Sequence, residues 1–414
     1  MENLTQDVQI LRDLAKQYKE ITAKPIQQER RELWRRHNSL QPTRPPIYIR
    51  AFAWGEILDP SCLKCQDPFF RSYEQFFHMM FYRDTLPDDV IAEPWVTVPA
   101  VRRHASSDNT PWGVHATRIS SGVRGGAAKY DPPIKEPEDI LKLVKPRHII
   151  DEEATRQRVE KVRDAIGDII EVNVGRHPVL WGHSAVISTD LAMLRGLEQI
   201  MWDMTDRPEW LHQLLGILRD GILGVHEEAE KAGDLQLADH DNQAVSYSQE
   251  LKDPKANSGA VKRRDLWHFF HSQEYALISP EMFDEFMLHY QIPIMEKYGL
   301  VSYGCCEDLT RKIPYLKKIP NLRRIAVTPW ADKRRCAEQI GRDYVLSWRP
   351  SPTDAVSFGL DPAAVRRTVE EARDIFQENG NIWDITLKDV ETVQGDAKRV
   401  QEWTRIVREV VESC

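Results

Sequence analysis

The sequence predicts an α/β protein: a (β/α)8 TIM-type barrel that follows an N-terminal helical extension. From about residue 150 onward, short apolar runs alternate with longer amphipathic segments, which is typical of parallel strands joined by crossover helices. The chain has 414 residues, and seven or eight such strands favour a closed barrel over an open sheet. Hydrophobic residues make up 41% of the chain and charged residues 29%, which allows a sizeable core.

The N-terminal segment has the spacing of two amphipathic helices over residues 4–37. Pro42, Pro45 and Pro46 end this helical pattern. We therefore expect a helical extension over 1–44 and a barrel over 45–414.

The sequence of residues 45–414 predicts a regular succession of strands and helices. Residues 102–135 are rich in Gly, Ser, Thr and Pro, which predicts a hairpin or a long active-site loop. The expected extended segments are 47–52, 90–98, 168–174, 178–187, 234–238, 266–270, 300–304, 323–328, 344–347 and 382–387. The expected helices are 73–81, 152–165, 189–204, 208–231, 280–297, 308–318, 331–341, 361–378 and 395–412.

Composition and charge exclude several classes of protein. The net charge is −8, whereas a nucleic-acid surface needs basic patches that neutralise phosphates. There is no apolar run of about 18 residues that would span a membrane, and the N-terminus lacks the pattern of a signal peptide. Six cysteines, two of them adjacent, indicate reduced thiols in a cytoplasmic protein. Cys62 and Cys65 form a lone CxxC, which is expected to be a loop with free thiols.

The most promising site follows the expected strand 300–304. In an α/β barrel the active site lies at the carboxyl ends of the strands, and here the sequence continues Cys305-Cys306-Glu307. Gly304 allows a turn that a side chain would hinder. Thiolate and carboxylate groups suit zinc. The alternative is that Cys305 is a small buried residue and Cys306 lines a pocket.

A second candidate follows the expected strand 234–238, which ends in Asp239 and His240. A histidine beside a carboxylate suits a metal ligand or a general acid or base. The alternative is a structural histidine that bonds to a neighbouring helix. The expected catalytic residues are Asp239, His240 and Glu307. The expected metal ligands are His240, Cys305, Cys306 and Glu307.

Polar and aromatic residues at the other strand ends suggest a substrate site. Arg349 suits a carboxylate, which a guanidinium binds with two hydrogen bonds. The aromatic residues would line a pocket for a flat or hydrophobic ligand if they converge, and core packing is the alternative. The expected substrate-binding residues are Arg50, Trp54, Glu56, His183, Tyr275, Tyr303, Trp330 and Arg349.

Three blocks of the sequence resemble the uroporphyrinogen decarboxylase superfamily. The stretch from Leu194–Glu198 to Asp206–Glu209 is similar to the family's helix pair with its acidic-x-Pro-Glu join. Ser279–Phe283 resembles the family's Ser-Pro-Glu helix start. Tyr303–Glu307 stands where the methyltransferase branches carry a His-x-Cys-Gly zinc motif. The resemblance implies the same barrel.

The resemblance implies one of two chemistries. Decarboxylases of the family hold substrate carboxylates with arginines after the first strand, where this chain has Arg50. Corrinoid-dependent methyltransferases use zinc to activate a methyl donor or acceptor, and Cys305 matches the cysteine of their motif. Tyr303 occupies the histidine position of that motif. The remaining ligands would therefore come from His240, Cys306 and Glu307.

The leading hypothesis is zinc-assisted methyl transfer between a small methylated compound and a corrinoid (cobalamin) carried by a partner protein. The second is a metal-independent decarboxylase or lyase that acts on a different carboxylate. The third is a binding protein that kept the barrel and lost the chemistry. No nucleic-acid or membrane partner is expected, and the N-terminal helices suit a homodimer contact.

Overall fold

A computed structural model describes residues 2–51, 53–106, 110–123, 128–180 and 186–413. Its main sheet has six parallel strands in the order β1-β12-β11-β10-β9-β8. These strands are β1 (Ile47–Ala51), β8 (Trp267–Phe270), β9 (Leu300–Tyr303), β10 (Leu322–Val327), β11 (Val345–Trp348) and β12 (Ile382–Val390).

The remaining strands form three separate pairs. One pair is parallel, and two are antiparallel. They join β2 (Trp95–Pro99) to β7 (Glu171–Gly175), β3 (Arg102–Arg103) to β6 (Ile149–Ile150), and β4 (Thr117–Ser120) to β5 (Ala128–Asp131). Among the described residues, the hydrogen-bonded sheet is therefore a curled six-stranded one, and the expected eight-stranded barrel is not closed by strand pairing.

The expected strand 234–238 is wrong. Those residues lead into a short 3-10 helix, Leu237–Asp239. Asp239 accepts a hydrogen bond from the backbone N–H of Gln236 at 2.9 Å. Such local side-chain bonds compete with strand pairing.

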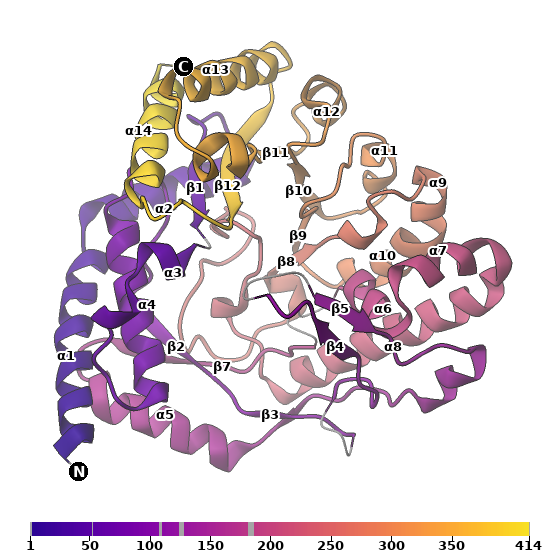
Figure 1. Cartoon of the computed structure of the whole chain (residues 1–414), viewed down its shortest axis with the longest axis horizontal. Helices are drawn as coiled ribbons and strands as arrows, with labels where there is room; N and C mark the ends of the chain where they lie inside the picture. The colour runs from indigo at the N-terminus through magenta and orange to yellow at the C-terminus, as the bar shows by residue number, and fades with distance from the viewer. Residues whose placement is uncertain (1, 52, 107–109, 124–127, 181–185, 414) are drawn as a thin grey trace.

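The six-stranded sheet is curled (Figure 1). Side chains from strands that are not neighbours therefore meet on one of its faces. The Arg324 guanidinium on β10 lies 2.9 Å from the Asp384 carboxylate on β12, although β11 runs between these strands. Ser347 on β11 donates to the same carboxylate at 2.9 Å. We call the face that carries these groups the inner face.

Helices cover the outer face of the sheet (Figure 1). Local sequence sets their ends; for example, Asp361 caps α13 by accepting from the backbone of Ala363 and Ala364, and Pro362 opens the helix. The helices of this half are α6 (Ile187–Arg195), α7 (Leu197–Asp206), α8 (Pro208–Ala232), α9 (Pro280–Phe283), α10 (His289–Met295), α11 (Ile313–Leu316), α12 (Lys333–Ile340), α13 (Pro362–Glu378) and α14 (Lys398–Glu412).

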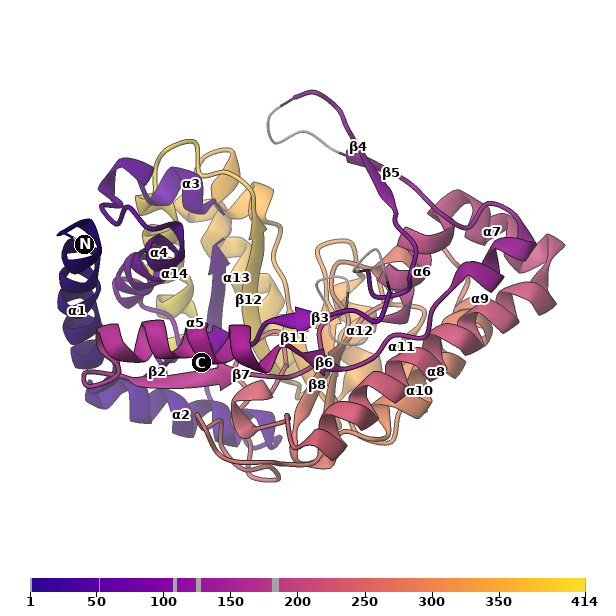
Figure 2. The same cartoon turned by 90° about the horizontal axis from the view of Figure 1, so that it is seen from below.

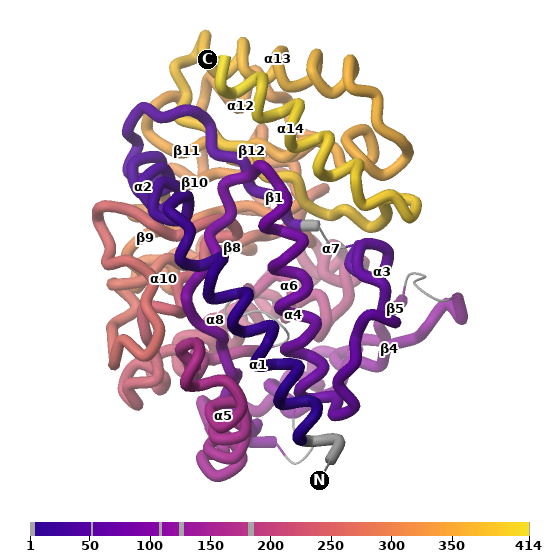
Figure 3. Tube along the Cα trace, turned by 90° about the vertical axis from the view of Figure 1, so that its left-hand side faces the viewer, coloured from indigo at the N-terminus to yellow at the C-terminus, as the bar shows by residue number. Residues whose placement is uncertain are grey.

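The N-terminal half builds a second apolar cluster around β2 and β7. Helices α1 (Glu2–Thr22) and α4 (Pro68–Asp84) lie side by side there, with α5 (Glu152–Ile166) beside them (Figure 3). Helix α2 (Pro25–Asn38) reaches the inner face of the main sheet, where buried His37 lies 3.2 Å from Asp384. The N-terminal helices are therefore tied to the barrel part by buried polar contacts.

The Gly-rich segment forms the hairpin β4–β5, which projects from the body of the protein (Figure 2). Its first strand is exposed along its whole length. No helix within the described ranges is long and apolar enough to cross a membrane.

Gly221 on α8 faces the indole of buried Trp112, and an added Cβ would lie 2.5 Å from that ring. We therefore expect Gly221→Ala to lower the free energy of unfolding by about 1–3 kcal/mol, because the core has no room for the methyl group. Gly216 lies on the same helix, and its nearest neighbour is 4.0 Å away. Gly216→Ala should instead raise the free energy by about 0.5–1 kcal/mol. Urea unfolding measures both, and equal shifts would contradict this packing.

Candidate functional site

Cys305 and Cys306 follow the carboxyl end of β9, and their sulfur atoms lie 3.5 Å apart. Gly304 directs the chain here with φ of 104°, a conformation that L side chains rarely adopt. A Cβ at this position would also lie 2.6 Å from Leu309 and 2.9 Å from Ala326. Glycine is therefore required where the chain turns toward the inner face.

Lys388 on β12 brings a positive charge to the two thiols. Its Nζ donates to Cys305 Sγ at 3.2 Å and to Cys306 Sγ at 3.1 Å. Asp389 completes the cluster, because its carboxylate lies 3.0 Å from Lys388 Nζ and 3.5 Å from Cys306 Sγ. Two strands separate β12 from β9, so the curl of the sheet brings these groups together.

The loop that carries the thiols is held by Arg349 and Glu307. Buried Arg349, just after β11, donates from Nη1 to the carbonyl of Cys305. Buried Glu307 accepts from the backbone N–H of Cys305 at 2.8 Å and of Ser272 at 2.9 Å. Both carboxylate oxygens of Glu307 are thus bonded to the backbone, which gives this residue a positioning role.

The backbone is strained on both sides of the thiol pair. Gln243 has φ of 46° and Asp389 has φ of 58°, and Gln243 Nε2 lies 3.5 Å from Cys305 Sγ. Non-glycine residues in this region cost on the order of 1–3 kcal/mol each and cluster at functional sites. Two such residues lie beside the thiol pair, which adds to its interest as a candidate site.

The thiol pair shares one negative charge. The pKa of Cys305 is lowered to about 5 by a hydrogen bond from Cys306 and, against the effect of burial, by the charges of Lys388 and Arg349. The same hydrogen bond, together with burial, raises the pKa of Cys306. Around neutral pH the pair is therefore a thiolate at Cys305 next to a thiol at Cys306.

A pocket of about 480 Å³ opens at the thiol pair. Trp330 lines it and is 80% exposed, and three prolines with fixed φ form part of its wall. Its other lining residues include Cys305, Cys306, Thr328, Arg349, Lys388 and Asp389. The structure thus gathers four expected residues here: Cys305, Cys306, Trp330 and Arg349.

Asp239 and His240 lie elsewhere. His240 Nδ1 accepts from the backbone N–H of Trp267 at 3.0 Å, and Nε2 bonds to the carbonyl of Lys252. Trp267 opens β8 and pairs with Leu300 of β9. Cys305 comes five residues after Leu300. At a rise of about 3.3 Å per residue, it therefore lies on the order of 15 Å from His240. Asp239 pairs with His177 at 3.1 Å. Burial lowers the pKa of His240 to about 4, so this ring is neutral.

The residues at the thiol pair do not fit a zinc site. His240 is too distant to complete the ligand set, and Glu307 is committed to backbone N–H groups. The Lys388 ammonium contacts both sulfur atoms, which is the place that a metal cation would take. Across the described ranges, no group of three or more His, Cys, Asp or Glu side chains is arranged to hold a metal ion.

Four of the other expected substrate residues, Tyr303, Tyr275, Glu56 and Trp54, have structural contacts or are buried. Tyr303 donates to Gln291 at 2.7 Å and Tyr275 is buried. Glu56 accepts from the loop after β12, at Thr392 and at the backbone of Val393 and Gly395. Trp54, which opens α3 (Trp54–Ile57), packs edge-on against Tyr82. Arg50 lies near the end of β1 beside β12, and His183 lies outside the described residues.

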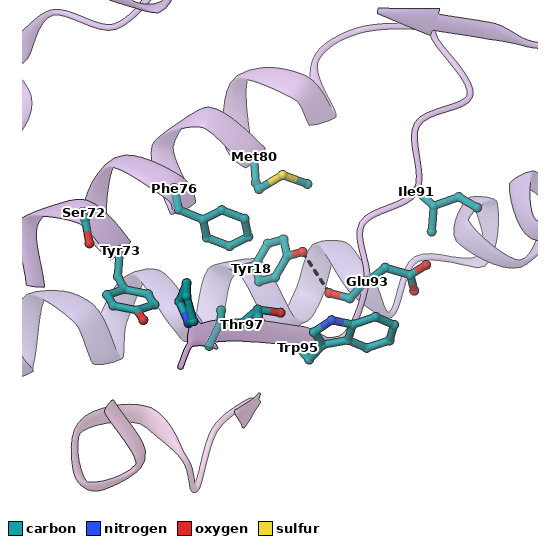
Figure 4. Close-up of a pocket in the computed structure, with 11 residues that line it drawn as sticks. Tyr18, Ser72, Tyr73, Phe76, Met80, Ile91, Glu93, Trp95 and Thr97 are labelled. Carbon is teal, nitrogen blue, oxygen red and sulfur yellow. Dashed lines mark hydrogen bonds between the residues drawn. The ribbon is translucent and has the colours of Figure 1, made fainter. Parts of the chain in front are cut away.

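A second cavity of about 490 Å³ lies between α1, α4 and β2 (Figure 4). Aromatic side chains dominate its lining, and the Tyr18 hydroxyl donates to the carbonyl of Glu93 at 2.8 Å. The residues labelled there include Tyr73, Phe76 and Trp95. Its lining carries neither a thiol nor a lysine or arginine, so the pocket at Cys305 is the better candidate for chemistry.

Three residues at the thiol pair are not among the expected site residues: Lys388, Asp389 and Gln243. Lys388 and Asp389 follow the expected strand 382–387, and from the sequence they could equally be a surface pair. In the structure the strand extends to Val390. In the sequence, the feature that points to Lys388 and Asp389 as site residues is their position at the end of a strand of an α/β sheet. Gln243 lies in a polar segment that carries no such signal.

Comparisons with known proteins find a likeness in structure. No family model matches the chain, and no curated protein matches it. A methyltransferase from Methanosarcina mazei is similar in structure, with a TM-score of 0.53 and 11% sequence identity. The match covers 92% of this chain and 97% of that one. The chain therefore shares its overall fold with this methyltransferase.

Proposed function

We propose that the protein is a methyltransferase that acts on a small methylated compound in the pocket at Cys305. The observation that carries this proposal is the thiol–thiolate pair bound to Lys388 at the carboxyl ends of the strands. The fold shared with a methyltransferase supports it. The parallel pair β2–β7 would add two strands to the six of the main sheet, as in the barrel of the uroporphyrinogen decarboxylase superfamily.

The site supplies charge and a proton to the atom that gives up the methyl group. When the methyl carbon leaves an oxygen, nitrogen or sulfur atom, that atom keeps the bonding electron pair. The Lys388 ammonium and the Arg349 guanidinium stabilise the developing negative charge. The proton shared by Cys305 and Cys306 then neutralises it. In this proposal Lys388, Arg349 and the thiol pair stabilise the charge and supply the proton, and no zinc ion is required.

We propose a corrinoid on a partner protein as the other methyl carrier. Cobalt in such a group supplies a centre that accepts or donates a methyl group. Trp330, at the exposed rim of the pocket, gives this partner an aromatic surface to contact. Reduced thiols at the site suit the cytoplasm.

Mixing the purified protein with a reduced corrinoid and single methylated donors tests the proposal. We expect the absorption spectrum of a methylated corrinoid with at least one donor, and no change when the protein is left out. If donors with methyl groups on oxygen, nitrogen and sulfur all fail while the protein remains folded, the proposal is wrong.

Decarboxylation is the second candidate function, and the positively charged side chains of Arg349 and Lys388 favour it. Arg349 Nε is buried without a hydrogen-bond partner, and Lys388 lines the same pocket. Together they would hold a carboxylate, and the thiol pair would protonate the carbanion left by CO2. Release of labelled CO2 from a carboxylate, with no methyl transfer, would favour this function.

A further inference from the structure

A histidine directly follows β8, the strand beside β9 in the sheet, and a glutamate lies beside this histidine. Phe269 and His271 share one face, with ring centroids 5.4 Å apart, whereas His268, which precedes Phe269, stacks on Tyr298 at 4.1 Å. Gly304 donates its backbone N–H to Phe270 at 2.9 Å. His271 and Cys305 are therefore the next residues of two neighbouring strand ends.

Glu274 is held where its carboxylate meets His271. Thr189 on α6 donates to Glu274 Oε1 at 2.7 Å. The other oxygen, Oε2, is buried without a hydrogen-bond partner and lies 3.8 Å from His271 Nδ1. A buried carboxylate oxygen left unpaired is costly. Catalytic hydrogen bonds are often long until substrate binds.

We infer that His271, oriented by Glu274, returns a proton to the thiolate of Cys305 during turnover. This inference rests on the proposed function, which spends the proton of the thiol pair in each cycle. In the return step the N–H bond of His271 breaks and its electrons stay on nitrogen. The S–H bond forms from a lone pair of the thiolate, so the step needs no oxidant or reductant.

The rate at which iodoacetamide alkylates Cys305 tests this inference as a function of pH. Cys306→Ser keeps a hydrogen-bond donor and leaves a single thiol at the site, which peptide mass spectrometry can follow. The charged and titratable groups that face Cys305 are Cys306, Lys388, Arg349 and His271, with Asp389 beyond Cys306. Glu274 faces His271 from the 3-10 helix Gln273–Tyr275.

In the Cys306→Ser protein, we expect His271→Asn to move the pH profile of alkylation upward by about one unit, because His271 contributes to the lowered pKa of Cys305. Glu274→Gln should move it in the same direction by less. His212→Asn is the matched control: His212 also pairs with a glutamate, Glu285 at 3.3 Å, on helices away from the site. It should leave the profile unchanged.

Profiles of the His271 and Glu274 variants that coincide with that of their parent would overturn the inference. If His271→Asn fails to fold by circular dichroism, Glu274→Gln decides alone, since it preserves size. Alkylation does not need methyl transfer, so the two proposals can fail separately. Shifted profiles without methyl transfer would support the role of His271 and contradict the proposed methyltransferase function. Methyl transfer with unshifted profiles would support the function and contradict the role of His271.

Discussion

Cys305→Ala is expected to lower kcat for methyl transfer by about 10²–10⁴-fold, the usual contribution of acid–base catalysis. Cys305 carries the thiolate of the pair and contacts Lys388, Cys306 and Gln243. Alanine removes the sulfur and leaves the loop held, because Glu307 and Arg349 bind the backbone of residue 305. Steady-state kinetics of the folded variant measure the loss.

Cys62→Ala is the matched control for this substitution. Cys62 is an exposed free thiol in the N-terminal half, and it does not line the pocket at Cys305. We expect full activity from it. A Cys305→Ala protein that keeps more than half of the wild-type kcat would show that the thiol pair is not part of the reaction.

Lys388→Met is expected to lower kcat by about 10²–10³-fold, as the loss of one preformed charge-stabilising donor does. It should also change the pH dependence. The folded protein lowers the pKa of Cys305 from 9.0 to about 5, so the thiolate persists above about pH 5 and is lost as the pH falls through that value. Without the ammonium, this loss should occur about 1–3 units higher in pH.

Two further variants separate charge from packing at this position. Lys388→Arg keeps a cation and should retain part of the activity and most of the low-pH profile. Lys333→Met removes a lysine that pairs with Glu371 on the outside of the protein, and it should change neither. If Lys388→Met kept the wild-type pH profile, the ammonium would have no role in holding the thiolate.

Much of the fold could be predicted from local pattern. Mainly apolar runs at 266–270, 300–304 and 382–387 fall on β8, β9 and β12, because parallel strands are buried on both faces. The segment 234–238 alternates polar and apolar residues, which also suits a strand, yet the Asp239 carboxylate bonds to the backbone three residues earlier. The separate pairing of β2 with β7 depends on long-range contacts that no local pattern contains.

The site could be predicted only in part. Cys305 was found because it follows a strand and Gly304. Lys388 could equally be a surface residue as far as the sequence shows, since its contact with the thiols crosses two intervening strands and exists only because the sheet curls. His240 was misplaced for the opposite reason: the false strand put it at the wrong end of the sheet. Residue type and spacing suggested zinc, but they could not show that a lysine occupies the place of the cation.

Protection of Cys305 by a substrate tests most directly whether this pocket is the active site. A compound that the protein turns over is added at increasing concentration, and the alkylation of Cys305 and Cys62 is followed in the same sample. We expect Cys305 to become protected over the concentration range in which the rate saturates, while exposed Cys62 reacts as before. Saturated turnover with Cys305 alkylated at its original rate would place the active site elsewhere.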